Sequence, residues 1–125
     1  MIKSLLLIAS GGAAGSVMRF LVQKWFAETT PSVFPWGTFV VNLAGCFLIG
    51  LIFAVSERML ILGPRMRFLL ITGFCGGFTT FSAFSFENLA LLRSGEYAYA
   101  LLYGLLSVVL GIAAVFGGIV LAKAM

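Results

Sequence analysis

Four long stretches without a single charged residue are the feature that most constrains this chain. A helix of about 20 apolar residues crosses the ~30 Å hydrocarbon core of a bilayer. With 62% hydrophobic and 10% charged residues and a mean hydropathy of +1.15, the chain lies far outside the composition of soluble domains. The sequence therefore predicts an all-α integral membrane protein with four transmembrane helices in a single domain, residues 1–125. The four stretches are Ser4–Met18, Thr29–Ser56, Phe68–Phe86 and Tyr97–Ala122.

Turn-forming and polar residues separate these spans. We expect the first span to continue through Arg19 to Phe26, and we expect connections at Ala27–Pro35, around Leu60–Arg65 and at Arg93–Glu96. Four spans bring both termini to the same side. The distribution of lysine and arginine favours termini inside, but the bias is slight, so insertion in both orientations stays open.

The chain lacks the residues that catalysis and most metal sites require. It has no histidine and only four acidic residues, which lie in different turns or span ends, so no acid–base pair is predicted and an enzyme is excluded. Cys46 and Cys75 lie in apolar stretches and are interpreted as reduced packing residues. The formal charge of +4 comes from residues scattered near span ends, which suits lipid headgroups and argues against a nucleic-acid partner.

Small residues recur at helical spacing and predict close contacts between helix backbones. Gly11 and Gly15 form a GxxxG pattern in the first span, and Gly73 and Gly77 form another in the third. A stripe of small residues also runs down one face of the fourth span. Its members are Gly104, Ser107, Gly111, Ala114 and Gly118.

The third span contains the most unusual segment, because paired glycines and paired threonines stand in mid-membrane. Gly76-Gly77 and Thr79-Thr80 favour a helix that is interrupted near its middle. The freed backbone carbonyls then need another helix, water or a cation as partner. Beyond this point phenylalanines at 78, 81 and 84 alternate with hydroxyls at 79, 82 and 85.

Phenyl edges, hydroxyls and one amide predict a binding path for a small anion. The edge of a phenyl ring is electropositive, so rings held edge-on can stabilise a dehydrated anion without a fixed charge. Asn42, in the middle of the second span, is either a hydrogen-bonded link between helices or a pore-lining donor. Arg19 is either a sequestered cation that favours anions, or a side chain that reaches the headgroups or pairs with Glu87.

The whole chain resembles the small fluoride channels of bacteria, the Fluc or CrcB proteins. The resemblance is carried by Gly73-Phe74-Cys75-Gly76-Gly77-Phe78-Thr79-Thr80-Phe81-Ser82, by Gly37-Thr38-Phe39-Val40-Val41-Asn42-Leu43-Ala44-Gly45, and by Gly12-Ala13-Ala14-Gly15 leading to Arg19-Phe20. It implies passive fluoride export through two pores of an antiparallel, dual-topology homodimer in the bacterial inner membrane.

The same resemblance implies the site residues. Asn42 and the phenyl edges of Phe81 and Phe84 would hold fluoride, with the hydroxyls of Ser82 and Ser107 along the pore. Arg19 and Glu87 would be vestibule or structural charges. Ala83 departs from the family pattern, which often has a hydroxyl there. A structural sodium ion at the dimer interface would be held by the backbone carbonyls of Gly76 and Thr79 from both subunits.

Two other functions compete with a channel on the sequence alone. A small multidrug exporter has a similar size, but it needs a carboxylate deep in its first helix, where this chain has Arg19. A structural subunit would explain the glycine stripes but not the Phe, Thr and Ser pattern after Gly77.

Overall fold

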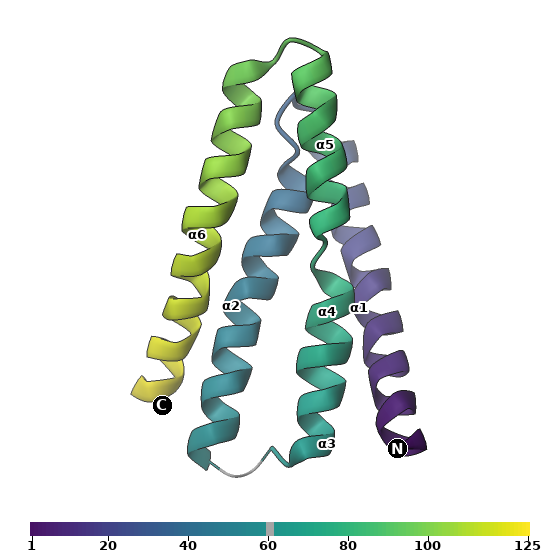
Figure 1. The fold of residues 1–125 in the computed structure, drawn as a ribbon, viewed down its shortest axis with the longest axis vertical. Helices are drawn as coiled ribbons and strands as arrows, with labels where there is room; N and C mark the ends of the chain where they lie inside the picture. Colours follow the sequence, from purple (N-terminus) through teal and green to yellow (C-terminus); the bar gives the residue numbers. More distant parts are fainter. Residues whose placement is uncertain (60–61) are drawn as a thin grey trace.

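The computed structural model describes residues 1–59 and 62–125, and all regular elements within these ranges are helices (Figure 1). Four segments are long and apolar enough to cross a membrane, and both chain ends lie at the same end of the molecule. The prediction of four spans is therefore confirmed, and the chain is a multi-pass membrane protein. The elements are α1 (Ile2–Thr29), α2 (Trp36–Met59), α3 (Pro64–Arg67), the π-helix η1 (Phe68–Cys75), α4 (Gly76–Phe78), α5 (Phe81–Arg93) and α6 (Tyr97–Ala124).

The helix ends differ from the charge-free stretches in ways that proline explains. α1 contains Arg19 as predicted, but it continues past Phe26 to Thr29. α2 begins at Trp36, directly after the predicted first connection, because Pro31 and Pro35 interrupt the charge-free stretch before it. In the predicted second connection, Leu60 and Ile61 lie outside the described residues. The third connection turns at Gly95, whose φ of 77° is readily adopted only by glycine.

The third span is built from four helical pieces and is broken near its middle. η1 and α4 lead up to Phe78, after which Thr79 (φ −80°, ψ 156°) and Thr80 (φ −151°, ψ 114°) are extended. α5 then starts at Phe81. The predicted interruption is confirmed, and it falls on the threonines because β-branched residues favour extended backbone, whereas Gly76 and Gly77 stay helical.

The glycine patterns allow helix backbones to meet, as predicted. A Cβ added at Gly15 would lie 2.8 Å from the amide nitrogen of Phe78, and one at Gly77 would lie 2.9 Å from the Cα of Gly12. These contacts join α1 to the lower half of the third span. On the other side, Gly118 of α6 lies against α2, where an added Cβ would be 2.7 Å from the nitrogen of Leu51.

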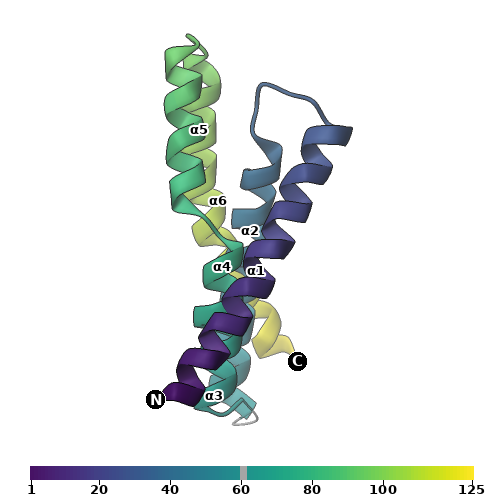
Figure 2. The ribbon, with the colours of Figure 1, turned by 90° about the vertical axis from the view of Figure 1, so that its right-hand side faces the viewer.

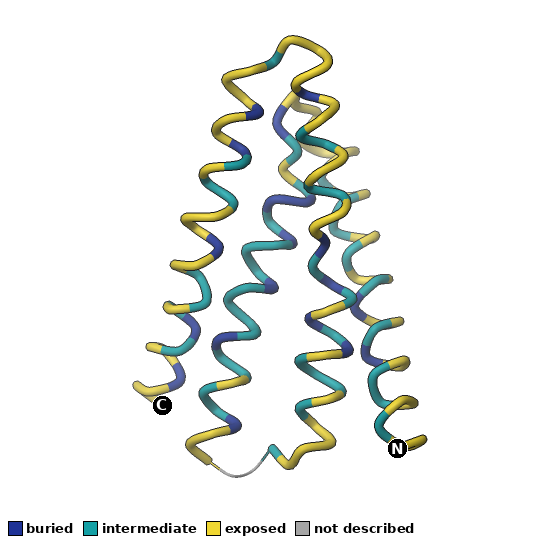
Figure 3. The backbone as a smooth tube through the Cα atoms, in the orientation of Figure 1, coloured by how far each residue is buried: buried dark blue, intermediate teal, exposed yellow. Residues whose placement is uncertain are grey.

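The break changes how the spans are arranged. Above the break α5 and α6 lean away from the upper parts of α1 and α2 (Figure 2). Buried residues face the inside of the bundle, while the outer faces of α1 and α6 are largely exposed (Figure 3). These faces are available to lipid or to another protein surface.

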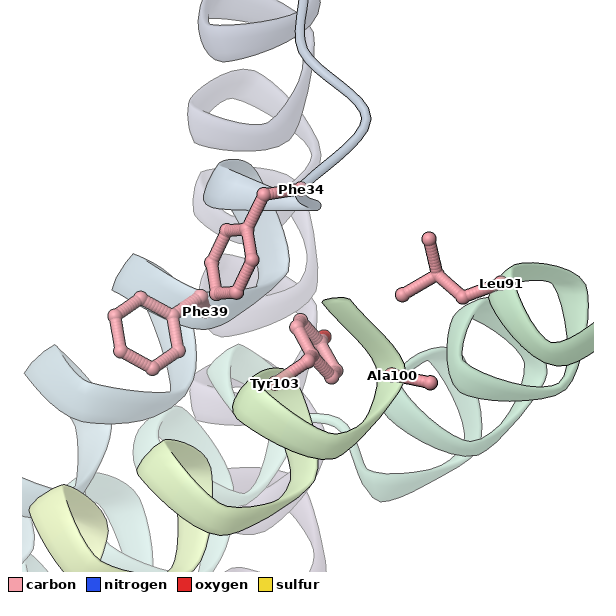
Figure 4. Packing of buried hydrophobic residues seen from close by; sticks show 5 residues of the cluster. All are labelled: Phe34, Phe39, Leu91, Ala100 and Tyr103. Carbon is pink, nitrogen blue, oxygen red and sulfur yellow. The ribbon is translucent and has the colours of Figure 1, made fainter. Parts of the chain in front are cut away.

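Aromatic side chains pack between the start of α2 and the α5–α6 pair in the upper half of the molecule. Phe34 and Phe39 from the start of α2 and its preceding connection pack with Leu91, Ala100 and Tyr103 (Figure 4). Tyr103 is 0% exposed, and its ring centroid lies 5.3 Å from that of Phe34 at an interplanar angle of 63°. This edge-to-face packing fixes the position of Tyr103 on α6.

Candidate functional site

A pocket of about 510 Å³ lies at the break in the third span. α2, the third span and α6 all contribute to its walls. The pocket therefore brings together most of the residues that the sequence singled out, from three different spans. These are Asn42 of α2, Gly76, Thr79, Phe81 and Phe84 of the third span, and Ser107 of α6.

The side-chain amide of Asn42 forms hydrogen bonds to the backbone at the helix break through both its nitrogen and its oxygen. Its Nδ2 donates to the carbonyl of Thr80 at 3.1 Å, and the amide N–H of Thr80 donates to its Oδ1 at 2.8 Å. The two bonds satisfy the polar groups that the break exposes in a region poor in water. Asn42 thus links two helices, while the second N–H of its Nδ2 is left for another acceptor.

The hydrogen bonds at the break take helical donors away from the carbonyls of two residues, Gly76 and Thr79, that line the pocket. In an uninterrupted helix the carbonyl of Gly76 would accept from Thr80 N–H, and that of Thr79 from Ala83 N–H. Instead Thr80 N–H donates to Asn42, and Ala83 N–H donates to the Thr80 hydroxyl at 3.1 Å. Unwound carbonyls of this kind suit an alkali cation, so Gly76 and Thr79 fit the role that the resemblance gives them.

Phe81 and Phe84 lie next to each other on the first turn of α5, with ring centroids 5.7 Å apart. Phe84 is stacked on Tyr103 at 4.9 Å and 15°, so one face of its ring is covered and its edge is directed elsewhere. Phe81 is 80% exposed in the protomer. Both side chains line the pocket at the break.

Of the two serines predicted to line the pore, only Ser107 lies at the pocket at the break. Ser107 lines the pocket, but the exposed Ser82 does not, and its Oγ is 3.1 Å from Oγ1 of Thr80. Ala83 lines a separate cleft on the other side of α5. The hydroxyl that the family often has at this position would therefore point away from the pocket at the break.

Four polar side chains, three of which sequence reasoning missed, form a network above the pocket. The hydroxyl of Thr38 donates to Oε1 of Glu87 at 2.6 Å, and the Tyr103 hydroxyl donates to Oε2 at 2.8 Å. Gln23 Nε2 in turn donates to the Thr38 hydroxyl at 3.0 Å. Thr38 is only 2% exposed. It lies one turn before Asn42 on α2, on the same face of the helix.

A second cleft, of about 620 Å³, opens above this network. It is bounded by the end of α1, the connection to α2, and α5, in the region where the arms of the molecule separate (Figure 2). Thr38 and Glu87 line its inner end. The network thus lies between the upper cleft and the pocket at the break.

Arg19 takes no part in either cavity. It is half-buried on α1, while both oxygens of Glu87 accept from hydroxyls. Within residues 1–59 and 62–125 the one ion pair is Lys24–Glu28, at 3.8 Å. The Arg19–Glu87 pair, which the sequence left open, is therefore not formed in this protomer.

The fold and the pocket together define a small multi-pass membrane protein whose third span is broken beside a largely apolar pocket with a few polar groups. A model of the family described as CrcB-like protein, Camphor Resistance (CrcB) matches residues 6–119. The chain belongs to this family.

The relatives agree with that assignment over nearly their full length. The fluoride-specific ion channel FluC of Leptospira interrogans serogroup Icterohaemorrhagiae serovar copenhageni is 52% identical over 97% of this chain and 95% of its own. Its namesake from Flavobacterium psychrophilum is 48% identical over 97% of this chain and 98% of its own, and that from Rhizobium etli is 46% identical over 96% of each. These relatives are named as channels, which agrees with the prediction that the chain is not an enzyme.

Proposed function

We propose that this chain is a fluoride-specific ion channel that lets fluoride leave the cytoplasm passively across the bacterial inner membrane. The observation that carries the proposal is the pocket at the break. There the Asn42 amide, the phenyl edges of Phe81 and Phe84, and the Ser107 hydroxyl converge from three spans. The name of the similar proteins supports fluoride as the ion.

The path runs from the upper cleft, past the polar network, into the pocket. Thr38 and Asn42 are four residues apart on α2, which separates them by about 6 Å along the helix. Tyr103 and Ser107 have the same spacing on α6. The lower layer offers the remaining N–H of Asn42 and the Ser107 hydroxyl, whereas the Thr38 and Tyr103 hydroxyls of the upper layer already donate to Glu87. The stacked ring of Phe84 stands between the layers.

The chemistry of the lining suits a small, strongly hydrated anion. Fluoride must exchange its water for donors, and the free N–H of Asn42 and the Ser107 hydroxyl supply them. Phenyl edges add a weak positive potential along a dry passage. The Glu87 carboxylate would repel an anion, but both of its oxygens already accept hydrogen bonds, which hold the charge in place beside the path. Ser82 completes the proposed hydroxyl set at the exposed end of the break.

The proposal includes an antiparallel homodimer that encloses two such pores. Phe81 is 80% exposed at the mouth of the pocket, so one protomer leaves this ring without a wall opposite it. A second copy in the opposite orientation would supply that wall. It would also double the free carbonyls of Gly76 and Thr79, which together would hold a structural sodium ion on the axis of the dimer.

The test compares two phenylalanines on the same helix. Phe84→Leu removes a ring from the pocket, and Phe86→Leu removes one that is 75% exposed and lines neither cavity. Fluoride efflux from liposomes should fall at least about tenfold for Phe84→Leu, which corresponds to ~1.4 kcal/mol, and should stay near wild type for Phe86→Leu. Equal efflux from both variants would remove the phenyl edge from the mechanism.

A further inference from the structure

Basic side chains gather at the end of the molecule that is opposite to the upper cleft. α2, α3 and α6 meet there, close to both chain termini (Figure 1). Arg58 lies in the last turn of α2, Arg67 is the last residue of α3, and Lys123 lies in the last turn of α6. Arg65 adds a further exposed cation. Among the described residues none of these cations has a carboxylate within ion-pair distance.

Arg58 is held in place by the end of α6. Its Nη1 donates to the carbonyl of Ala122 at 3.2 Å and also to that of Lys123. The last carbonyls of a helix have no donor of their own, so this contact ties α2 to α6. The N–H groups on Nε and Nη2 of the same guanidinium are left to bind an acceptor.

A groove of about 350 Å³ lies directly beside these cations. Its apolar part is formed by Phe53, Ala54 and Ile119, which lie further into the span. Its rim is formed by Glu57, Arg58 and Lys123. The guanidinium carbon of Arg67 lies 5.0 Å from the centroid of the Phe53 ring, so a third cation lies against one of the residues that line the groove.

We propose that this groove binds the headgroup of an anionic phospholipid, with phosphatidylglycerol as its occupant. The phosphate would lie among Arg58, Arg67 and Lys123, because three cations outnumber the single carboxylate at the rim. The glycerol hydroxyls of the headgroup would donate to the Glu57 carboxylate. A choline headgroup has no N–H or O–H group that could donate there. The first acyl carbons would follow Phe53 and Ile119 into the membrane. The proposal does not depend on which ion the protein conducts.

The experiment titrates the purified full-length protein in a nonionic detergent with short-chain phosphatidylglycerol, and counts retained lipid by native mass spectrometry. Phosphatidylcholine and phosphatidylethanolamine are titrated in parallel. We expect phosphatidylglycerol to bind at least about tenfold more tightly than either, given two or three charge contacts. Equal binding of the three lipids overturns the proposal.

Matched variants locate the site. Arg67→Gln combined with Lys123→Gln removes two cations of the groove but spares Arg58 and its tie to α6, and it should weaken phosphatidylglycerol binding about 25-fold. Lys24→Gln combined with Arg93→Gln removes two cations from the opposite end of the molecule and should leave binding unchanged. Should the first double variant not fold, Lys123→Gln alone should weaken binding about fivefold.

Two further outcomes overturn the proposal. One is an equal loss of phosphatidylglycerol in both double variants, since binding would then follow net charge and not the groove. The other is displacement of the lipid by millimolar inorganic phosphate, since the groove would then recognise a free phosphate and not a lipid. Retention of the lipid against phosphate supports it, because the acyl chains contribute contacts with Phe53 and Ile119.

Discussion

Replacing Asn42 with leucine should weaken the fold at the break in the third span. The leucine side chain has a similar size, but it removes the two hydrogen bonds to the backbone of Thr80. An interhelical hydrogen bond in a membrane protein is worth about 0.6 kcal/mol on average and up to about 1.7. Because both Thr80 groups would also stay unpaired where water is scarce, the free energy of unfolding should fall by about 2–4 kcal/mol.

The assay is reversible unfolding in mixed micelles, followed by the fluorescence of the two tryptophans, Trp25 of α1 and Trp36 at the start of α2. The matched control is Asn88→Leu. Asn88 is half-buried on α5 and lines neither cavity, so its replacement should change the free energy of unfolding by about 1 kcal/mol or less. The comparison separates the loss of the Thr80 bonds from the loss of an amide in general.

A third variant separates stability from conduction. Asn42→Asp keeps an acceptor for the amide N–H of Thr80, but it sets a second oxygen against the Thr80 carbonyl and adds a negative charge to the proposed path. It should unfold more easily than wild type, and the protein that stays folded should not pass fluoride. If Asn42→Leu proved as stable as Asn88→Leu, the role of Asn42 in supporting the break would be refuted.

Two other substitutions test the packing around the site. Gly15→Ala should reduce the yield of folded protein in a size-exclusion assay, because the new Cβ would lie 2.8 Å from the nitrogen of Phe78, whereas Gly117→Ala, with nothing within 4 Å, should behave as wild type. Equal yields would mean that α1 can move away without cost. Tyr103→Phe keeps the ring but removes the hydroxyl that donates to Glu87, so the free energy of unfolding should fall by about 1 kcal/mol. An unchanged value would show that water replaces this donor.

The larger features of the fold were predictable because they follow from the bilayer itself. Charge-free stretches must become helices there, since no water satisfies the backbone. The glycine contacts between α1 and the third span also followed from spacing alone. The start of α2 at Trp36 was predictable as well, because Pro31 and Pro35 mark the preceding charge-free residues as a connection.

The local geometry of the site was harder to obtain from sequence. Paired glycines and paired threonines both predict an interruption, and only the structure distinguishes them by holding Thr80 on the amide of Asn42. The link between Thr38 and Glu87 joins residues that are 49 positions apart. Such a contact depends on how helices are rotated against each other, which periodicity within one helix does not determine. The sequence thus predicted which residues gather at the site, but not which of them form hydrogen bonds with each other.

The most direct test of the proposed function is ion efflux from liposomes that contain the purified protein, read with a fluoride electrode beside identical vesicles loaded with chloride. A fluoride-specific channel should empty the fluoride vesicles rapidly while chloride is retained. Retention of both ions, or equal release of both, would contradict the proposal that the pocket at the break of the third span selects fluoride.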